Sequence, residues 1–259
     1  MRPKCLVLRA AGTNCDLETA EAIKIAGGDP EILHINVLIK GEKKLDDYQM
    51  LVIPGGFSYA DSISAGKILS NILKNNLKHQ LKKFIDEGKP VLGVCNGFQA
   101  LIKSGFLPFS NEVNQSAYLI INKNGLFIDT WVYLKINPKS ICLLTKNSPN
   151  VIYLPINHGE GRFVCNKKEL EKIFESNQVV YLYSSINGIV DEAYNPNGSV
   201  MNIAAITNEY GNVFGIMPHP EKFVIKYQHP NWTRFPNLKE EGDGLFIYSN
   251  AVKLAKKFC

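Results

Sequence analysis

Closely spaced cysteine pairs are missing from this 259-residue chain, although it contains six cysteines. No two of them stand in a Cys-x-x-Cys spacing, which argues against a zinc site and a redox dithiol, so no metal is expected. Scattered thiols are typical of proteins from reducing compartments, and we therefore expect a cytoplasmic protein. The six are Cys5, Cys15, Cys95, Cys142, Cys165 and Cys259.

Long apolar runs and a one-sided charge are also missing. No apolar stretch approaches the length of a membrane span and no secretory signal opens the chain, so no membrane partner is expected. The 29 basic and 24 acidic residues leave a net charge of only +5, and the lysines are scattered. This balance is typical of a solvated surface and argues against a nucleic-acid partner.

Phosphate-binding glycine motifs are absent as well. The chain has no Walker-type loop and no acidic cluster for a metal ion, so ATP chemistry is not expected on it. Its 45% hydrophobic and 20% charged residues are ordinary for a globular protein. The length permits one large core or two small ones, and no linker or repeat divides the chain. We predict a single domain over residues 1–259.

The first half of the chain alternates short apolar runs with stretches of helical periodicity. The runs predict buried strands, and the main helical stretch is expected to break near Asn75. The resulting order, β-α-β-β-α-β-α, predicts a doubly wound, mostly parallel sheet. The predicted strands are residues 4–8, 32–37, 50–53 and 90–94, and the predicted helices are 17–26, 68–85 and a helix from residue 98.

After Pro108 the pattern changes to short strand candidates separated by turns that contain Asn, Gly and Pro. We interpret these strands as an antiparallel extension of the main sheet rather than a second domain. A helix is predicted at residues 167–175, and a C-terminal helix is predicted to be capped by Asp243. The strand candidates are residues 118–121, 126–134, 140–144, 151–156, 179–183, 200–206 and 212–217.

The segment Gly93-Val94-Cys95-Asn96-Gly97 joins a predicted strand directly to a predicted helix. Such a turn strains its central residue, and glycines two positions before and after it relieve the crowding; with serine at the centre this is a nucleophile elbow. Cys95 would then stand at a helix N-terminus, which favours its thiolate. The amide of Asn96 would face a developing oxyanion. A free core cysteine in an ordinary turn is the alternative.

Gly55 and Gly56 follow the third predicted strand, at the edge where an open α/β sheet binds ligands. A loop without Cβ atoms exposes its backbone amides. Gly56 is therefore predicted to supply the second amide of an oxyanion hole, and a simple tight turn is the alternative.

His219 and Glu221 stand on either side of a proline. The proline drives His219 into extended backbone geometry, and residues i and i+2 of an extended chain project to the same side. Glu221 would then hold one imidazole nitrogen and leave the other free for a thiol, which is the orienter–base half of a catalytic triad with Cys95. A rigid proline turn with an exposed histidine is the alternative.

Two further residues compete for catalytic roles. His158 lies in a polar, glycine-rich segment with no carboxylate fixed beside it, so a binding-site or loop role is favoured over catalysis. Cys15 also follows a predicted parallel strand, but it lacks the flanking glycines of an elbow. A packing role is favoured for this second thiol.

Together these motifs resemble the class I, or triad, glutamine amidotransferases, through the elbow as far as Gln99, the Gly-Gly loop and the His-Pro-Glu segment. Within that family the chain is similar to the glutaminase subunits of phosphoribosylformylglycinamidine synthases. Five motifs along nearly the whole chain carry this closer resemblance: Gly12-Thr13-Asn14-Cys15-Asp16, Gly55-Gly56-Phe57-Ser58-Tyr59, His158-Gly159-Glu160-Gly161-Arg162, Asn195-Pro196-Asn197-Gly198-Ser199 and Gly242-Asp243-Gly244-Leu245. The subfamily usually has glycine in place of Ala60 and arginine in place of Ser64 and Lys222.

The resemblance implies a flavodoxin-like sheet and L-glutamine as the substrate. Cys95 would form a thioester, His219 would act as acid and base, and Glu221 would hold the imidazole. The amides of Gly56 and Asn96 would stabilise the oxyanion. The resemblance also implies substrate contacts, through backbone or side chain, from Phe57, Ser58, Gln99 and His158.

Partners follow from the same resemblance. Ammonia would pass to a large synthetase subunit that binds ATP and Mg and converts formylglycinamide ribonucleotide into formylglycinamidine ribonucleotide in purine biosynthesis. A small accessory subunit is also implied, and no cofactor is expected in this chain itself. The alternatives are a glutaminase subunit of another class I amidotransferase, a γ-glutamyl cysteine hydrolase that works alone, and an inactive scaffold subunit, against which the intact triad residues argue.

Overall fold

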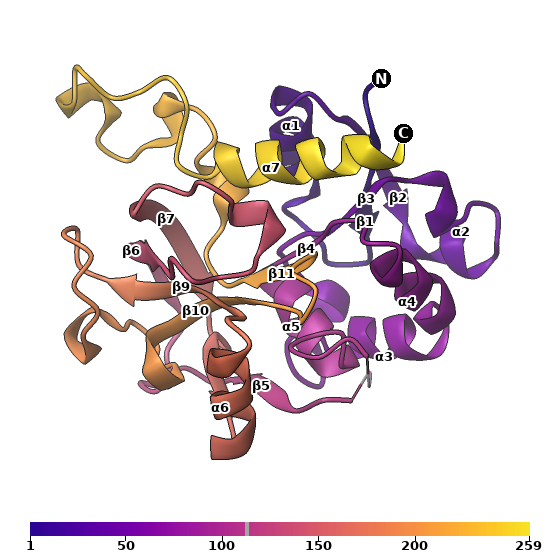
Figure 1. The fold of residues 1–259 in the computed structure, drawn as a ribbon, viewed down its shortest axis with the longest axis horizontal. Coiled ribbons are helices and arrows are strands. Elements are labelled where there is room, and N and C mark those ends of the chain that lie inside the picture. The colour runs from indigo at the N-terminus through magenta and orange to yellow at the C-terminus, as the bar shows by residue number, and fades with distance from the viewer. Residues whose placement is uncertain (112–113) are drawn as a thin grey trace.

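Nine strands form one sheet in the order β2-β1-β3-β4-β11-β10-β9-β6-β7 in a computed structural model, which describes residues 1–111 and 114–259. A second, two-stranded sheet pairs β5 with β8. Figure 1 shows the large sheet crossing the molecule, with the two chain termini close together beside its first strands.

The first half of the large sheet is parallel. Its strand order, with β11 in the last place, is that of flavodoxin-like folds, so the predicted doubly wound sheet is confirmed. Strands of this kind are covered on both faces and therefore read as continuous Val, Ile and Leu runs. They are β2 (Asp29–His34), β1 (Lys4–Arg9), β3 (Met50–Ile53), β4 (Val91–Val94) and β11 (Val213–Ile216).

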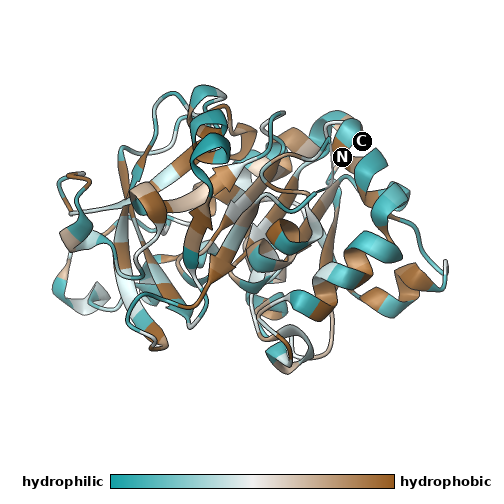
Figure 2. Cartoon of the chain, turned by 90° about the horizontal axis from the view of Figure 1, so that it is seen from below, coloured by the Kyte–Doolittle hydropathy of each residue, from teal (hydrophilic) through white to brown (hydrophobic). Residues whose placement is uncertain are grey.

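Helices cover both faces of this parallel half. Figure 1 shows one pair above the sheet, α1 (Asp16–Ile25) and α7 (Leu245–Ala255), and a second group below it, α3 (Lys67–Asn75), α4 (Lys78–Asp86) and α5 (Asn96–Ser104). The break predicted near Asn75 is confirmed, because α3 ends there. In Figure 2 the hydrophobic residues gather on the strands and on the inward helix faces, while the hydrophilic residues lie outside.

The second half of the large sheet is antiparallel, as predicted. One buried apolar cluster includes strand residues from both halves of the large sheet. In the described part of the chain, no helix has the length and apolar character needed to cross a membrane. The antiparallel strands are β10 (Ile203–Thr207), β9 (Val179–Ser184), β6 (Ile128–Ile136) and β7 (Val151–His158), accompanied by α6 (Lys167–Glu175) and the small sheet of β5 (Ala117–Ile120) and β8 (Arg162–Cys165).

Three predicted strands differ in the structure. The stretch 200–206 begins as a short 3-10 helix at Val200–Asn202, so its strand starts only at Ile203. The strand expected at residues 32–37 ends at His34, and α2 (Ile35–Ile39) begins directly after it. Nδ1 of His34 accepts the amide hydrogen of Asn36 at 3.2 Å and so caps this helix. The stretch 140–144 is not a strand. The amide of Leu143 donates to the carbonyl of Gly211, in a hairpin loop, at 2.8 Å. A short 3-10 helix begins at Leu143.

Asp243 does not cap the C-terminal helix. Its Oδ2 accepts the amide hydrogen of Tyr153 at 2.8 Å, and no side chain bonds the first turn of α7 at its N-cap. The carboxylate therefore ties the start of α7 to β7 instead, a long-range contact that the local sequence does not reveal.

Candidate active site

Cys95 stands where β4 ends and α5 begins. Its backbone has φ 48° and ψ −104°, a left-handed conformation that costs a non-glycine residue about 1–3 kcal/mol. A Cβ at Gly97 would lie 1.9 Å from the carbonyl oxygen of Ile53, so only glycine lets α5 approach β3 this closely. The turn therefore has the strained strand-to-helix geometry of a nucleophile elbow.

Helix α5 is seated firmly against the sheet. Phe98 packs over Gly215, where a Cβ would lie 2.1 Å from the phenyl ring. The amide of Cys95 donates to the carbonyl of Ile216 at 2.8 Å, which ties the turn to β11. The amide of Asn96, the first residue of the helix, has no intrahelical acceptor, and a helix N-terminus favours negative charge beside it.

His219 and Glu221 follow β11 at the same edge of the sheet. Nδ1 of His219 lies 2.5 Å from Oε1 of Glu221, and both side chains are buried. The amide of His219 donates to the carbonyl of Pro155 at 2.9 Å, which anchors the segment to β7. Nε2 of His219 has no partner among the described residues, so it is the nitrogen left for a reacting group.

Burial and charge act in opposite directions on His219. Burial favours the neutral imidazole, but the carboxylate of Glu221 and the nearby thiols of Cys95 and Cys15 favour the charged form, and the pKa of His219 is raised well above its ordinary value. A Cβ at Gly55 would lie 2.6 Å from Cε1 of this ring, so glycine makes room for it. A charged imidazole stabilises a thiolate next to it.

The loop after β3 contains the amide of Gly56, which is predicted to serve an oxyanion hole. Gly56 has φ 142°, and a Cβ there would lie 2.7 Å from the amide nitrogen of Asn14. The next amide, that of Phe57, donates to the carbonyl of Gly12 at 2.9 Å. The amide of Gly56 has no acceptor in the part of the chain that the structure describes, and it can therefore serve an oxyanion.

The two residues that follow offer less than the resemblance implies. The amide of Ser58 donates to Oδ1 of Asn96 at 3.1 Å, and the amide of Phe57 is bonded to Gly12. Neither backbone amide is therefore free for a substrate. What remains is the buried Ser58 hydroxyl, without a partner in residues 1–111 and 114–259, and the half-exposed ring of Phe57.

Three successive residues then adopt left-handed backbones. Tyr59, Ala60 and Asp61 have φ values of 55°, 56° and 49°, which is rare for residues with a Cβ. Oδ1 of Asp61 accepts hydrogen bonds from Nδ2 of Asn96 at 3.0 Å and from the amide of Gly66 at 3.1 Å. Burial raises the pKa of Asp61. The loop is thus held in a strained shape by a half-buried carboxyl group.

One face of α5 holds this loop from the other side. Nε2 of Gln99 donates to the carbonyl of Glu160 at 2.6 Å, and its Oε1 accepts from Asn96 at 3.0 Å. Nζ of Lys103 donates to the carbonyl of Ala65 at 2.6 Å and lies 3.4 Å from Oε2 of Glu160. Gln99 lines the cavity as expected, but its amide is already engaged within the protein.

Lys103, Glu160 and Asp61 are site residues that the sequence reasoning missed. The available signal was spacing, since Asn96, Gln99 and Lys103 recur on one helical face. Their partners lie on two other segments, which no local pattern joins to the helix.

His158 ends β7 and is buried. Its Nδ1 lies 3.1 Å from Oδ1 of Asn122, and a Cβ at Gly161 would lie 2.2 Å from the imidazole ring. Burial, and to a smaller extent the charge of His219, lowers the pKa of His158 to about 4, so the ring is neutral at pH 7. Its position favours a wall of the site over a catalytic base.

Two cavities open beside Cys95. The smaller, of about 160 Å³, extends toward Gln99, His158 and Glu160, and the larger, of about 340 Å³, extends toward Cys15, His219 and Lys222. The rings of Phe57 and Phe127 line both, with their centroids 6.4 Å apart. The sulfur of Cys95 is therefore reached from two compartments under one pair of aromatic rings.

Cys15 contacts the histidine without sharing the elbow. Its Sγ lies 4.0 Å from Nδ1 of His219 and 3.2 Å from Oδ1 of Asn14. Burial raises the pKa of Cys15, and the hydrogen bond to His219 only partly opposes this. The thiol approaches the nitrogen that Glu221 already holds, which favours a packing role.

Cys15, His219 and Glu221 also place three potential metal-binding atoms within 4.8 Å of one another. Two ligands of one tetrahedral zinc ion lie about 3.3 Å apart, because zinc–nitrogen and zinc–oxygen bonds are about 2.0–2.2 Å long. The nitrogen and the oxygen of this cluster are only 2.5 Å apart. The arrangement fits a shared proton rather than a metal ion.

Comparison with known proteins places the chain in a family. Residues 2–255 match the model of a CobB/CobQ-like glutamine amidotransferase domain. The chain is 43% identical over 256 residues to phosphoribosylformylglycinamidine synthase subunit PurQ of Dehalococcoides mccartyi, covering 98% of both, and 44% identical over 243 residues to the subunit of that name from Treponema denticola, covering 87% of this chain and 90% of the relative. It is similar to a chain in the structure of PurLQS from Thermotoga maritima, with a TM-score of 0.74, 30% identity, and coverage of 98% and 99%.

These matches span nearly the whole chain and confirm the resemblance read from its motifs. The chain belongs to the glutamine amidotransferase family, and within it to the PurQ subunits of phosphoribosylformylglycinamidine synthase.

Proposed function

We propose that this chain hydrolyses the side-chain amide of L-glutamine at Cys95 and delivers the ammonia to a synthetase chain, which converts formylglycinamide ribonucleotide into formylglycinamidine ribonucleotide in purine biosynthesis. The chain is an enzyme of the glutamine amidotransferase family. One observation carries the proposal. Cys95 and His219 line a single cavity, and Glu221 is bonded to the far nitrogen of the imidazole.

The first half-reaction forms a thioester. The Cys95 thiolate attacks the carboxamide carbon of glutamine, and the carbonyl π electrons move onto oxygen. The amides of Gly56 and Asn96 stabilise that oxyanion, and loss of one such donor typically costs about 3 kcal/mol of barrier. The charged His219 then gives its proton to the nitrogen, and the carbon–nitrogen bond breaks to release ammonia.

The second half-reaction returns the enzyme to its starting state. Neutral His219 removes a proton from water as its oxygen attacks the γ-glutamyl thioester. The carbon–sulfur bond breaks, glutamate leaves, and the Cys95 thiolate is again next to a charged imidazole. Glu221 holds the ring throughout, which keeps Nε2 directed at the reacting atoms.

The smaller cavity is our proposed glutamine site. Phe57, the Ser58 hydroxyl and His158 are the proposed substrate contacts, with the side-chain amide of the ligand placed beside Cys95. Gln99 acts through the protein in this proposal, because its amide holds the carbonyl of Glu160 in the cavity wall.

The proposed partners are a large synthetase subunit and a small accessory subunit. The Thermotoga maritima relative is part of a structure named PurLQS, which supports an assembly of this kind. We place ATP and Mg on the synthetase subunit and expect no cofactor on this chain. We also propose a cytoplasmic location, which agrees with the free cysteines of the described residues.

The test is the variant Cys95→Ser with the partner synthetase present. We expect it to abolish glutamine hydrolysis while the complex still makes product from added ammonia. Cys15→Ser is the matched control and should retain activity. Glutamine hydrolysis by Cys95→Ser would remove this thiol from the mechanism, and full activity of the wild-type chain without any partner would favour a γ-glutamyl hydrolase that works alone.

A further inference from the structure

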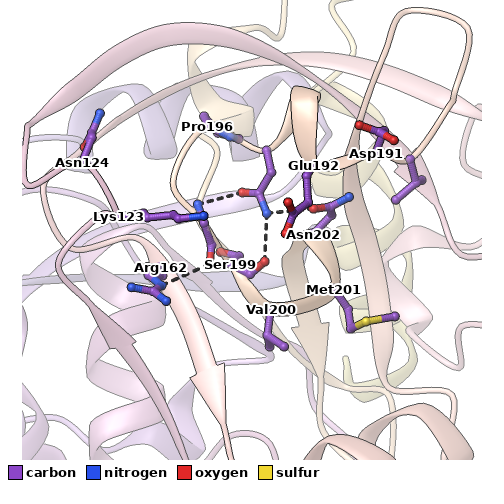
Figure 3. A pocket seen from close by; sticks show the side chains of 13 residues that line it. Lys123, Asn124, Arg162, Asp191, Glu192, Pro196, Ser199, Val200, Met201 and Asn202 are labelled. Carbon is purple, nitrogen blue, oxygen red and sulfur yellow. Dashed lines mark hydrogen bonds between the residues drawn. The ribbon is translucent and has the colours of Figure 1, made fainter.

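A cavity of about 820 Å³, larger than either catalytic cavity, shares no lining residue with the two cavities beside Cys95. Figure 3 shows the residues that line it. Its walls come from the turn after β5, the first residue of β8, and residues 190–202 between β9 and β10. We propose that this cavity is a docking socket for the synthetase chain and receives a loop that carries one acidic and one apolar side chain. The identity of the partner rests on the proposed function.

The socket is charged on opposite walls. Figure 3 shows Lys123 and Arg162 on one side of it and Asp191 and Glu192 on the other. Nε of Arg162 donates to the carbonyl of Gly198 at 3.1 Å, but within residues 1–111 and 114–259 neither cation forms an ion pair. An acidic side chain at the cationic wall would meet two uncompensated charges. The opposite wall would fix the direction of the incoming loop, since complementary charge sets register.

The socket also exposes the apolar side chain of Met201, whose backbone conformation is strained. Met201 has φ 50°, a left-handed backbone that is unfavourable for methionine by about 1–3 kcal/mol, and it is 61% exposed. Nδ2 of Asn195 donates to the carbonyl of Ser199 at 2.8 Å and to Oδ1 of Asn202 at 2.7 Å, which locks the turn. A pre-organised turn that presents methionine to solvent is suited to binding another chain.

Two segments contribute residues both to the socket and to the catalytic cavities. Lys123 lines the socket, and Phe127, at the end of the same turn, lines both catalytic cavities. His158 and Glu160 line the smaller catalytic cavity, and Arg162 of the same segment lines the socket. Two short segments, residues 123–127 and 158–162, therefore reach from the socket to the catalytic cavities.

Hydrogen bonds connect the two sites through one glycine. Nδ2 of Asn197 donates to the carbonyl of Gly161 at 2.9 Å. The amide of Gly161 donates to Oδ1 of Asn122 at 3.0 Å, and the same oxygen lies 3.1 Å from Nδ1 of His158. Asn197 itself is buried, but its neighbours Pro196 and Gly198 line the socket, so a chain seated there contacts the residues on either side of the first member of this network. Binding and substrate affinity are then coupled, and the coupling is reciprocal.

The synthetase is the occupant that this placement favours. Ammonia released at Cys95 is lost to water unless its consumer covers the mouth of the catalytic cavity. Leu126 and Phe127, between the two sites, are 63% and 54% exposed, so an apolar strip continues from the socket to that mouth. One partner that covers both would bury a surface of the size that specific complexes need.

The test compares single variants that change the socket alone. Lys123→Glu and Met201→Asp should each weaken binding of the synthetase chain about tenfold or more, measured as Kd at fixed ionic strength, and higher salt should narrow the difference for Lys123→Glu. Glutamine hydrolysis by the lone variants should stay within about twofold of wild type. Lys167→Glu, whose side chain is 91% exposed on α6, is the matched control and should bind normally.

A photo-reactive benzophenone amino acid in place of Met201 gives a second readout that does not depend on activity. We expect it to cross-link to the synthetase chain. An unchanged Kd in both socket variants would overturn the inference, as would a cross-link to the accessory subunit only. If the wild-type pair binds and cross-links as described but never hydrolyses glutamine, the proposed function fails and the docking socket stands.

Discussion

The imidazole of His219 is held at one nitrogen only. Its Nδ1 lies 2.5 Å from Oε1 of Glu221, while its Nε2 has no partner within the described residues. The carboxylate therefore fixes the plane and the charge of the ring, and it leaves the nitrogen on the other side for chemistry. Because both groups are buried, water competes poorly for this hydrogen bond.

Glu221→Gln keeps the shape of this contact and removes its charge. We expect kcat for glutamine hydrolysis to fall about 10²–10⁴-fold. In the wild type the raised pKa of His219 keeps the ring charged to higher pH than an ordinary histidine, so activity is lost only as pH rises through that raised pKa. Without the carboxylate the alkaline decline should move to lower pH, as measured by a pH–rate profile.

Glu171→Gln on the exposed side of α6 is the control for this change and should show the wild-type profile. Melting temperatures establish that each variant is folded. An alkaline limb at the same pH in Glu221→Gln and wild type would contradict the role assigned to the carboxylate.

Lys103 holds the strained loop from a distance. Lys103→Met keeps the aliphatic stem but leaves the carbonyl of Ala65 without this donor and the carboxylate of Glu160 with only the Ala65 amide, at a cost of about 1–3 kcal/mol. We expect KM for glutamine to rise about tenfold with a smaller change in kcat, because binding geometry is disturbed and the triad is not. Lys103→Arg should restore most of the lost affinity. A fall in kcat with KM unchanged would argue against a positioning role.

His158 should make stability depend on pH in a defined window. Its pKa is lowered from 6.5 to about 4 in the folded chain, so between these values the unfolded chain binds more protons. Stability therefore rises with pH across this window and is lost as pH falls, by up to about 3 kcal/mol. Urea unfolding at several pH values from about 4 to about 7 measures this change in the free energy of unfolding.

His158→Gln should flatten that dependence. His79→Gln is the control, because His79 is exposed on α4 and should leave the wild-type slope unchanged. The raised pKa of His219 acts above the window, since its contribution is complete below pH 6.5 and fades only as pH rises through the folded value. Equal slopes in wild type and His158→Gln would show that another group controls acid sensitivity.

The strand-to-helix turn at Cys95 and the pair of His219 and Glu221 were accessible from the sequence because each depends on a few adjacent residues. Gly97 admits the helix beside Ile53, and the proline after His219 extends its backbone. The alternation of apolar runs and helical stretches likewise predicted the parallel half of the sheet and its antiparallel extension. Local steric rules and periodicity act over a few residues, so they can be applied to a sequence without a structure.

The hydrogen bonds of the loop beyond Gly56 were not accessible in this way. Whether the amide of Phe57 is free depends on the carbonyl of Gly12, which a different strand brings into place. Asp243 caps nothing because the amide of Tyr153 lies within its reach. In each case the hydrogen bond is made to a partner more than forty residues away in the sequence, in place of the local interaction that the motif predicts.

The amino-acid sequence by itself determined the chemical groups of this protein, the fold class and the two short motifs that carry a thiol and an imidazole–carboxylate pair. Only the tertiary structure decided which nitrogen of His219 is unoccupied, that the Gly56 amide has no acceptor among the described residues, and that Arg162 and His158 belong to neighbouring cavities. The reason is physical. Backbone sterics act within a few residues, whereas the partner of a hydrogen bond is chosen by whichever distant segment the packed core brings to it.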